Sequence, residues 1–311
     1  MFDAKELRNP ADLRVDDIVI AFMGPTGSGK SNLIDTLTGQ VGKRSGSGLE
    51  SHTSELHAVR LRRHAQKGDR IVFVDTPGFD DTNRSDMEIL QMISKWLTDT
   101  YKNDVKLAGI VYTHRISDNR MAGTPYRNLR MFGELYGDKA ARNVILVTTM
   151  WDRVQRHLGE KRESELKSKY WKVLLDRGSD CYRFDNTQAS AWAVIDKILE
   201  SDDTETLLLQ EELVELRKRL QETQAGITLY DTLQKALLEQ KETIRQLAEQ
   251  ATLQNNPKLA KELEDEYKRI QITFEKTFQE LNQLKIPFTR RIVLLLFGKK
   301  SKARSLKIVG A

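Results

Sequence analysis

The sequence has almost none of the residues that cross-link a chain or bind a metal through sulfur. Its 311 residues include one cysteine, Cys181, which excludes a disulfide framework and a cysteine-based metal cluster and fits a reducing compartment. The five histidines are scattered, without the spacing of metal ligands. We therefore expect neither a disulfide-stabilised protein nor a zinc-type site.

Long apolar runs and an excess of one charge are missing as well. No window reaches the roughly 18 apolar residues of a membrane-spanning helix, and residues 1–9 are polar and charged rather than an apolar signal core. Basic residues number 50 and acidic residues 45, a near-balance that gives no reason to expect a nucleic-acid partner. We expect a cytoplasmic protein and, at this length, more than one structural unit.

The first 200 residues alternate short apolar runs with longer amphipathic stretches, which is typical of an α/β fold with a mainly parallel sheet. The predicted strands are 18–23, 57–61, 71–74, 107–112, 144–148 and a short sixth at 181–184. The predicted helices are 31–38, 86–100, 126–136, 164–175 and 191–199. Residues 42–48 read G-K-R-S-G-S-G and are expected to form a mobile loop.

The strongest motif follows the first of these strands directly. Residues 24–31 read G-P-T-G-S-G-K-S and match G-x-x-x-x-G-K-[ST] in full, with a strand before them and a helix after. Glycines let successive backbone N–H groups turn inward around phosphates, Lys30 reaches the β- and γ-phosphates, and the Ser31 hydroxyl ligates Mg²⁺. The motif therefore predicts a P-loop NTPase domain. Its candidate nucleotide-binding residues are Gly24, Pro25, Thr26, Gly27, Ser28, Gly29, Lys30, Ser31 and Asn32.

Two further segments complete a predicted phosphate and magnesium site. Asp75 ends a buried strand in the sequence D-T-P-G, as a carboxylate acting on Mg²⁺ beside a P-loop must, and the Gly78 N–H is placed to bond the γ-phosphate. Thr53, in S-H-T-S, occupies the place of the first-switch threonine that contacts Mg²⁺ and γ-phosphate, with Ser51 and Ser54 as competitors. Lys30, Thr53 and Gly78 are the candidate catalytic residues, and Ser31, Thr53 and Asp75 the candidate metal ligands.

Base recognition is predicted at the end of the strand 144–148. Thr149-Met150-Trp151-Asp152 stands where guanine-binding proteins carry [NT]-K-x-D, and an aspartate there accepts two hydrogen bonds that adenine cannot supply. Met150 replaces the usual lysine and offers an apolar side chain for packing on the base. Ser190, followed by alanine, fits the short S-A element that supports the base edge. The pattern favours GTP and GDP over ATP, and a P-loop ATPase or kinase remains the weaker alternative.

After about residue 200 the chain changes character. From 202 to 284 leucines recur at helical spacing, with charges between them, as in helices that pack on helices. Pro257 interrupts the pattern and predicts a hairpin with arms near 202–253 and 257–285; one long helix kinked at this proline is the alternative. We thus expect a G domain over 1–200, a coiled-coil-like helical hairpin over 201–286, and a tail over 287–311.

The tail carries a six-residue apolar run, 292–297, between basic residues. Such a segment either dips into an anionic membrane interface or packs on the rest of the protein. The hairpin seams are likewise filled within the molecule or by a partner helix.

These residues resemble the septin-like branch of P-loop GTPases, and in particular the AIG1 (immunity-associated, GIMAP) and Toc family, closest to AIG1-like G-domain proteins of fungi. The resemblance covers about residues 15–200. It is carried by I-A-F-M-G-P-T-G-S-G-K-S-N-L-I-D, S-H-T-S-E-L, I-V-F-V-D-T-P-G-F-D-D, L-A-G-I-V-Y-T-H-R-I-S-D and V-I-L-V-T-T-M-W-D. It implies a six-stranded G domain, GTP or GDP with Mg²⁺, and homodimerisation across the nucleotide face, on a membrane surface in some relatives.

One position departs from many GTPases. Phe79 stands where a glutamine often orients the attacking water, so we expect slow intrinsic hydrolysis. Asp80 and Asp81 are weak candidates for that role, and Arg44, Arg115 and Arg120 are interpreted as solvated or structural arginines. Two functions follow: a regulatory GTPase whose switches around Thr53 and Gly78 order with GTP, or a non-catalytic scaffold in which the hairpin binds a partner.

Overall fold

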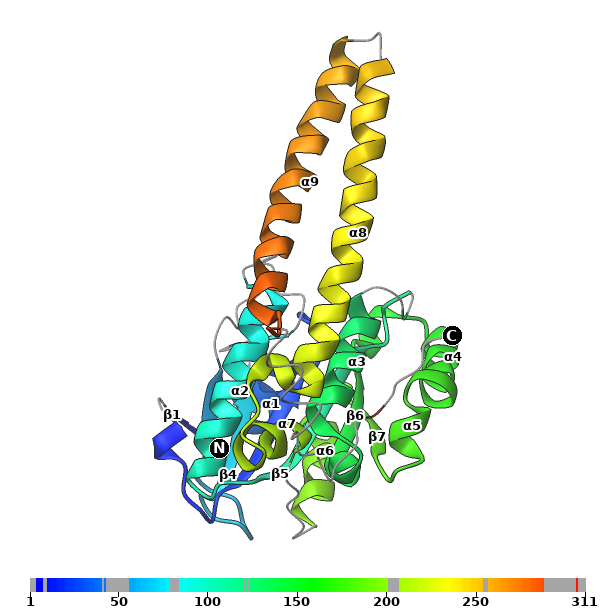
Figure 1. Ribbon diagram of the computed structural model, residues 1–311. Helices are drawn as coiled ribbons and strands as arrows, with labels where there is room; N and C mark the ends of the chain where they lie inside the picture. Colours follow the sequence, from blue (N-terminus) through cyan, green and yellow to red (C-terminus); the bar gives the residue numbers. More distant parts are fainter. Residues whose placement is uncertain are drawn as a thin grey trace. The chain divides into compact units, whose positions relative to one another are not determined.

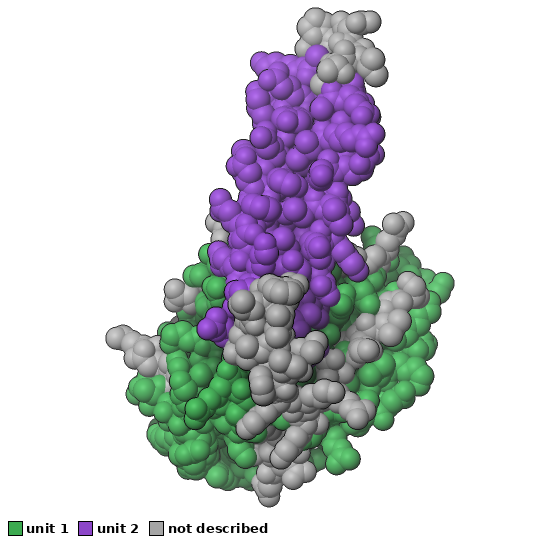
Figure 2. Space-filling model, in the orientation of Figure 1, with its two compact units in different colours: residues 1–218, 300–311 green, residues 219–299 purple. Residues whose placement is uncertain are grey.

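The structure is a computed structural model that describes residues 4–7, 10–40, 42, 56–78, 84–119, 121, 124–200, 207–253, 257–287 and 306. The chain divides into two compact units, coloured separately in Figure 2. The first comprises residues 1–218 and 300–311, and the second comprises residues 219–299. The first unit therefore extends past the predicted boundary at residue 200.

The first unit is built on a sheet to which the described residues contribute seven strands (Figure 1). The strands are β1 (Ala4–Leu7), β2 (Ile18–Met23), β3 (His57–Leu61), β4 (Ile71–Asp75), β5 (Leu107–Arg115), β6 (Val144–Thr149) and β7 (Asp180–Arg183). Their order across the sheet is β1-β3-β4-β2-β5-β6-β7. β1 and β3 pair antiparallel, β3 and β4 do likewise, and the other neighbours run parallel.

Six of these strands were predicted from the sequence, and β1 was not. The missed segment has four residues of mixed polarity, A-K-E-L, and its two central side chains are exposed. It therefore lacks the continuous apolar run of β4 and β6, which are buried along their whole length because helices cover both faces.

The helices of the first unit form two layers over the sheet. α1 (Lys30–Thr38) and α6 (Gln188–Leu199) contact each other, and their apolar side chains share one core with Ile20 and Phe22 of β2. Because side chains alternate along a strand, Met23 points to the other face, where its sulfur lies 3.6 Å from the Tyr136 hydroxyl. That hydroxyl belongs to α3 (Thr124–Tyr136), and both α3 and α2 (Asp86–Lys102) contact α7 (Leu208–Gln210).

The region predicted as one helix over 164–175 is broken in the structure. α4 (Arg156–Glu165) begins earlier, a π-helical turn follows at Leu166–Tyr170, and α5 (Lys172–Leu175) completes the segment. In this turn the Trp171 N–H reaches back 2.7 Å to the carbonyl oxygen of Leu166. The extra residue of the π turn lets both side chains face the core, and both are buried.

The second unit contains the predicted hairpin, with α8 (Gln224–Leu253) and α9 (Pro257–Leu284) in contact along it. The predicted seam residues are buried or half-buried in these helices: Leu233, Leu237, Ile244, Leu247, Leu263, Tyr267, Ile270, Phe274, Leu281 and Leu284. A hydrogen bond of 3.3 Å joins the Gln240 amide to the Thr277 hydroxyl across the seam. The two helices thus fill each other's apolar stripe.

The predicted first arm, 202–253, is wrong at its start. Residues 208–210 form α7 in the first unit, where Leu208 is fully buried and the Gln210 amide donates to the carbonyl oxygen of Leu97 at 3.3 Å. α8 begins only after Thr223, whose hydroxyl accepts a hydrogen bond of 3.0 Å from the Gly226 N–H and so caps the helix. The spacing of the leucines at 209, 213, 216 and 220 indicated helices that pack on helices. It could not show whether these leucines pack on the first unit or on the other arm of the hairpin.

No helix among the described residues is long and apolar enough to cross a membrane.

Candidate nucleotide-binding site

The predicted nucleotide-binding residues gather where the parallel strands β2, β4, β5 and β6 end. The segment 24–29 follows β2, Asp75 is the last residue of β4, and Thr149 is the last residue of β6. The carboxyl ends of parallel strands meet at one edge of a sheet, which is where ligands bind in open α/β folds. The topology therefore brings together motifs that lie more than a hundred residues apart in sequence.

The segment 24–29 has a backbone that only glycine adopts readily. Gly24, Gly27 and Gly29 have φ of 138°, 73° and 91°. A Cβ on Gly24 would lie 2.3 Å from the carbonyl oxygen of Thr113, so space as well as conformation excludes a side chain. Gly29 leads directly into α1, so the loop ends at the helix amino terminus, where the backbone N–H groups are available to an anion.

Lys30, Ser31 and Asp75 lie together beneath this loop. The Lys30 ammonium donates to the carbonyl oxygens of Gly24 at 2.9 Å and Pro25 at 3.1 Å, so its charge faces the loop. The Ser31 hydroxyl donates to a carboxylate oxygen of Asp75 at 2.6 Å. Asp75 itself is buried, with 1% of its surface exposed. A hydroxyl and a carboxylate held against each other are the oxygen ligands that suit Mg²⁺, so the donor set fits that ion.

Gly78 lies against the loop. A Cβ on Gly78 would be 2.4 Å from the backbone nitrogen of Thr26 and 2.8 Å from the carbonyl oxygen of Gly24. The Thr26 hydroxyl also donates to the carbonyl oxygen of Gly78 at 3.4 Å. The D-T-P-G segment thus touches the phosphate-binding loop through backbone atoms, and a larger residue at this position would push the two apart.

Threonines at the ends of β5 and β6 fix the loop from its other side. The hydroxyls of Thr113 and Ser28 are 2.6 Å apart, and the Thr149 hydroxyl donates to the carbonyl oxygen of Ser28 at 2.8 Å. Both threonines are buried. The Thr149 hydroxyl therefore supports the loop, and the role of Thr149 in base binding stays a prediction.

The predicted base-binding segment has an unusual backbone at Met150, a non-glycine residue with φ of 61°. A left-handed residue between a strand and a turn changes the chain direction, and such strain is common at binding sites. The turn that follows, Trp151–Arg153, presents Asp152 at the surface, while the Trp151 indole N–H donates to the Thr148 hydroxyl at 3.0 Å. The guanidinium of Arg183 lies 4.3 Å above the Trp151 ring.

Ser190 lies at the start of α6, and its hydroxyl donates to the carbonyl oxygen of Thr187 at 2.9 Å. The loop before α6 contacts α1, the helix that follows the phosphate-binding loop. The Asn32 amide of α1 donates to the side-chain oxygen of Asn186 in this loop at 2.8 Å. Asn186 has φ of 63°. The sequence analysis did not single out Asn186, and an asparagine in a short strand-to-helix loop was the available signal.

Thr53 lies outside the described residues, as do Phe79, Asp80, Asp81, Arg44, Arg120 and the loop over 43–48. Their predicted roles remain predictions.

The end of β5 holds Arg115, which was interpreted from the sequence as solvated or structural, and its neighbour His114. The Arg115 guanidinium lies beside the phosphate-binding loop, 3.3 Å from where a Cβ on Gly27 would be, and its Nε is 3.0 Å from a carboxylate oxygen of Asp118. His114 is buried, and desolvation lowers its pKa to about 4, with the charge on Asp118 opposing that shift and the charge on Arg115 adding to it. His114 lines a cavity of about 270 Å³ with Met121, Leu166 and other residues.

A mixed α/β sheet with a glycine-rich strand-to-helix loop and an adjoining Ser–Asp pair defines the P-loop class of nucleotide-binding domains. Residues 19–149 match the model of the family described as 50S ribosome-binding GTPase. The first unit therefore has a P-loop fold that is similar to this GTPase family over residues 19–149, and a long helical hairpin follows it in the sequence.

Solved structures with a similar arrangement come from several proteins. Toc33 from Arabidopsis thaliana, in complex with Mg²⁺ and GMPPNP, matches with 16% identity and a TM-score of 0.44, over 62% of this chain and 88% of that one. Translation elongation factor SelB from Methanococcus maripaludis, in complex with GppNHp, matches with 13% identity and a TM-score of 0.42, over 62% of this chain and 35% of that one. No curated protein matches the sequence.

Proposed function

We propose that the protein binds GTP and GDP with Mg²⁺ and hydrolyses GTP slowly, as a nucleotide-dependent switch. The observation that supports this most is the joint position of the glycine loop, the Ser31–Asp75 pair and Gly78 at one sheet edge. The loop and the α1 amino terminus supply N–H donors for phosphates, and Lys30 adds a positive charge. We propose further that the domain is of the AIG1/Toc type, on the motifs quoted above.

In this proposal the Ser31 hydroxyl and the Asp75 carboxylate hold Mg²⁺, whose charge offsets that developing on the phosphates. The Gly78 N–H reports the γ-phosphate, and because Gly78 touches the loop backbone, loss of that phosphate changes the position of the D-T-P-G segment. Thr53 joins the metal site when its segment orders. Phe79 cannot orient water, so catalysis is limited to positioning and charge neutralisation, and the hydrolysis rate is low.

The base is read by Asp152, whose exposed carboxylate accepts from the guanine N1–H and 2-amino group. Met150 packs on the ring, and the loop that holds Asn186 and Ser190 supports the base edge. The location we propose is the cytoplasm, since a sequence with one cysteine lacks the disulfide framework that is common in secreted proteins.

Titration calorimetry with GTP, GDP and ATP in the presence of Mg²⁺ tests this function on the wild type and on two Asp152 variants. We expect GTP and GDP to bind and ATP to be silent, and Asp152→Ala to weaken GTP by at least about a hundredfold through the loss of two charge-assisted hydrogen bonds. Asp152→Asn is the matched control: its amide offers a donor to the 2-oxo group of xanthine, so it should prefer xanthosine triphosphate to GTP. Equal binding of ATP, or an Asp152→Ala variant with unchanged GTP affinity, would contradict guanine recognition.

The scaffold function receives less support from the hairpin. Its apolar seam is filled by its own two helices, which leaves the exposed apolar side chains as the candidate partner surface: Ile227, Leu238, Leu259, Ile272 and Phe278. We therefore keep partner binding through the hairpin as the alternative to the switch, and the membrane role of the tail as a proposal for residues 287–311.

A further inference from the structure

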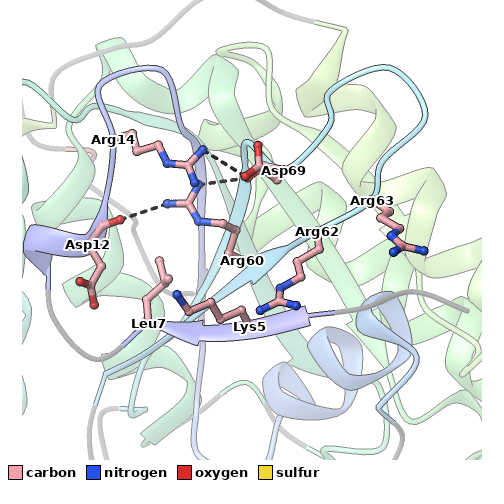
Figure 3. A pocket seen from close by; sticks show the side chains of 8 residues that line it. All are labelled: Lys5, Leu7, Asp12, Arg14, Arg60, Arg62, Arg63 and Asp69. Atoms are coloured by element: carbon pink, nitrogen blue, oxygen red, sulfur yellow. Dashed lines mark hydrogen bonds and ion pairs between the residues drawn. The ribbon is translucent and has the colours of Figure 1, made fainter.

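A basic cavity lies at the β1 side of the sheet, apart from the nucleotide-binding residues. Its volume is about 530 Å³, within the range of small-molecule sites. Figure 3 shows the side chains that line this space, which come from β1, β3 and the segments around them. The lining residues are Lys5, Leu7, Asp12, Arg14, Arg60, Arg62, Arg63 and Asp69.

The strand register separates the cavity from the phosphate-binding loop. His57 of β3 pairs with Asp75, at the nucleotide end of β4, whereas Arg60 pairs with Val72 near the opposite end. Three residues along a strand span about 10 Å, and the lining residues 62 and 63 lie further along the chain in the same direction. A ligand in this cavity therefore does not occupy the nucleotide site.

Two of the basic side chains are neutralised by the fold. Arg60 is buried and forms a two-pronged ion pair with Asp17, with 2.7 Å between its Nη2 and one carboxylate oxygen. Arg14 pairs with Asp69 at 3.1 Å, and this hydrogen bond lowers the pKa of the Asp69 carboxyl. These pairs explain the position of both arginines without any ligand. The dashed lines in Figure 3 mark the pair between Arg14 and Asp69 and the further hydrogen bonds that Arg60 donates to the carbonyl oxygens of Asp12 and Asp69.

No ion pair explains the positions of Lys5 and Arg63 in the same way. Both are exposed, and neither has an ion-pair partner within the part of the chain that the structure describes. Lys5 lies directly across from Arg60 in the antiparallel β1–β3 ladder, but the carboxylate of Asp17 is paired with Arg60 and not with Lys5. The other charged residues that line the cavity include Arg62, which directly follows β3, and Asp12.

We propose that this cavity binds a multiply phosphorylated ligand, as a free inositol polyphosphate or as a phosphoinositide lipid headgroup. Several guanidinium groups and an ammonium around one cavity suit phosphate oxygens, because arginine presents paired N–H donors and lysine a point charge. A ligand with more than one phosphate supplies negative charge to Lys5 and Arg63 together.

The test uses the full chain saturated with GDP and Mg²⁺, so that the P-loop is occupied. Inositol hexakisphosphate is titrated by calorimetry at near-physiological salt, and vesicles of phosphatidylcholine with and without phosphatidylinositol bisphosphate are used in sedimentation. The charge-reversal variant is Lys5→Glu with Arg63→Glu, and the milder variant is Lys5→Ala with Arg63→Ala. The matched control, Lys139→Glu with Lys161→Glu, makes the same charge change at two exposed lysines elsewhere in the first unit.

We expect saturable binding that the charge-reversal variant weakens by about tenfold or more and the control leaves within about twofold. The alanine variant should fall between them. Binding of the free polyphosphate identifies a small-molecule ligand, and sedimentation only with phosphoinositide vesicles identifies a lipid headgroup; either outcome supports the site.

Equal weakening in the control variant would show general electrostatic attraction and overturn the proposal. Absence of binding to both probes, or binding of RNA in their place, would overturn it as well. A Lys30→Ala variant separates this inference from the proposed nucleotide function. It should lose GTP binding and keep inositol hexakisphosphate binding, because Lys30 lies at the other end of the strands.

Discussion

At the level of single residues, the phosphate-binding loop depends on backbone positions that exclude side chains. Gly24 combines φ of 138° with a Cβ position 2.3 Å from the Thr113 carbonyl oxygen. Gly68 has φ of 62° but open space around it, which makes it a control for conformation alone. We expect Gly24→Ala to lower the free energy of unfolding by about 2–4 kcal/mol, and Gly68→Ala by about 1 kcal/mol.

Tryptophan fluorescence during urea unfolding is a suitable measurement, because Trp96, Trp151, Trp171 and Trp192 all lie in the first unit. Equal losses in the two variants would mean that the contact with Thr113 contributes nothing beyond backbone strain.

His114 makes a second residue-level prediction, in the pH dependence of stability. Burial lowers its pKa in the folded protein to about 4 from an ordinary 6.5, so the unfolded chain takes up the proton first as the pH falls. The stability that comes from the neutral form is complete above about pH 6.5 and declines towards pH 4, by about 3 kcal/mol in all.

Urea unfolding of the wild type and of His114→Asn, at about pH 7 and about pH 4.5, measures this decline. Acidic residues such as Glu163, whose pKa is lowered by its hydrogen bond with Arg183 against the opposing effect of burial, titrate in both proteins and cancel in the difference. The variant should lose less stability on acidification than the wild type. Parallel pH profiles would mean that His114 is not the titrating group.

At the level of elements, the short helix α7 belongs to the leucine-rich part of the sequence but packs in the first unit. It contacts α2 and α3, and Leu208 is fully buried. We expect Leu208→Ala to destabilise the first unit by about 2–5 kcal/mol, the usual range for a buried leucine. Leu238→Ala in α8, at a side chain 63% exposed, should stay within about 0.5 kcal/mol. Tryptophan-monitored unfolding of both variants distinguishes them, and a small effect of Leu208→Ala would place the end of the folded G domain near residue 200.

The sequence predicted elements well where one physical pattern dominated. Apolar runs such as 71–74 and 144–148 identified the buried strands, and Pro257 correctly predicted where the hairpin turns. Prediction from the sequence failed where contacts between distant segments determine the structure. Nothing local distinguishes the leucines of α7, which bury against α2 and α3, from those of α8, which face α9. The π turn at 166–170 and the short edge strand β1 were invisible for the same reason.

At the level of the whole molecule, the motifs predicted which residues gather at one edge of the sheet. They did not predict the hydrogen-bond partner of each side chain. Ser31 and Asp75 meet as the motifs required. Thr149 supports Ser28, and the loop that approaches Asn32 contains Asn186. These differences arise because a motif fixes residue identity and chain position, whereas side-chain direction depends on strand register and on neighbouring elements. The basic cavity shows the same limit, since its charges come from segments that only the β1–β3 pairing brings together.

Assembly provides the last prediction at this scale. If the protein is a switch that dimerises through its G domain, its oligomeric state depends on the bound nucleotide and on the groups that contact phosphate. Sedimentation velocity should show a dimer with a non-hydrolysable GTP analogue and Mg²⁺, and a monomer with GDP. Lys30→Ala should remain monomeric with either nucleotide, because its ammonium lies at the loop carbonyls where the phosphates would bind.

A hairpin variant distinguishes this switch from the scaffold. Leu238→Ser with Ile272→Ser removes two exposed apolar side chains, 63% and 69% exposed, and leaves the seam between α8 and α9 intact. For the switch, this variant dimerises with the GTP analogue as the wild type does. A dimer that forms with GDP and GTP alike, and that the hairpin variant abolishes, would instead assign assembly to the helices. The G domain would then be a structural nucleotide site, because the bound phosphate would no longer control the partner surface.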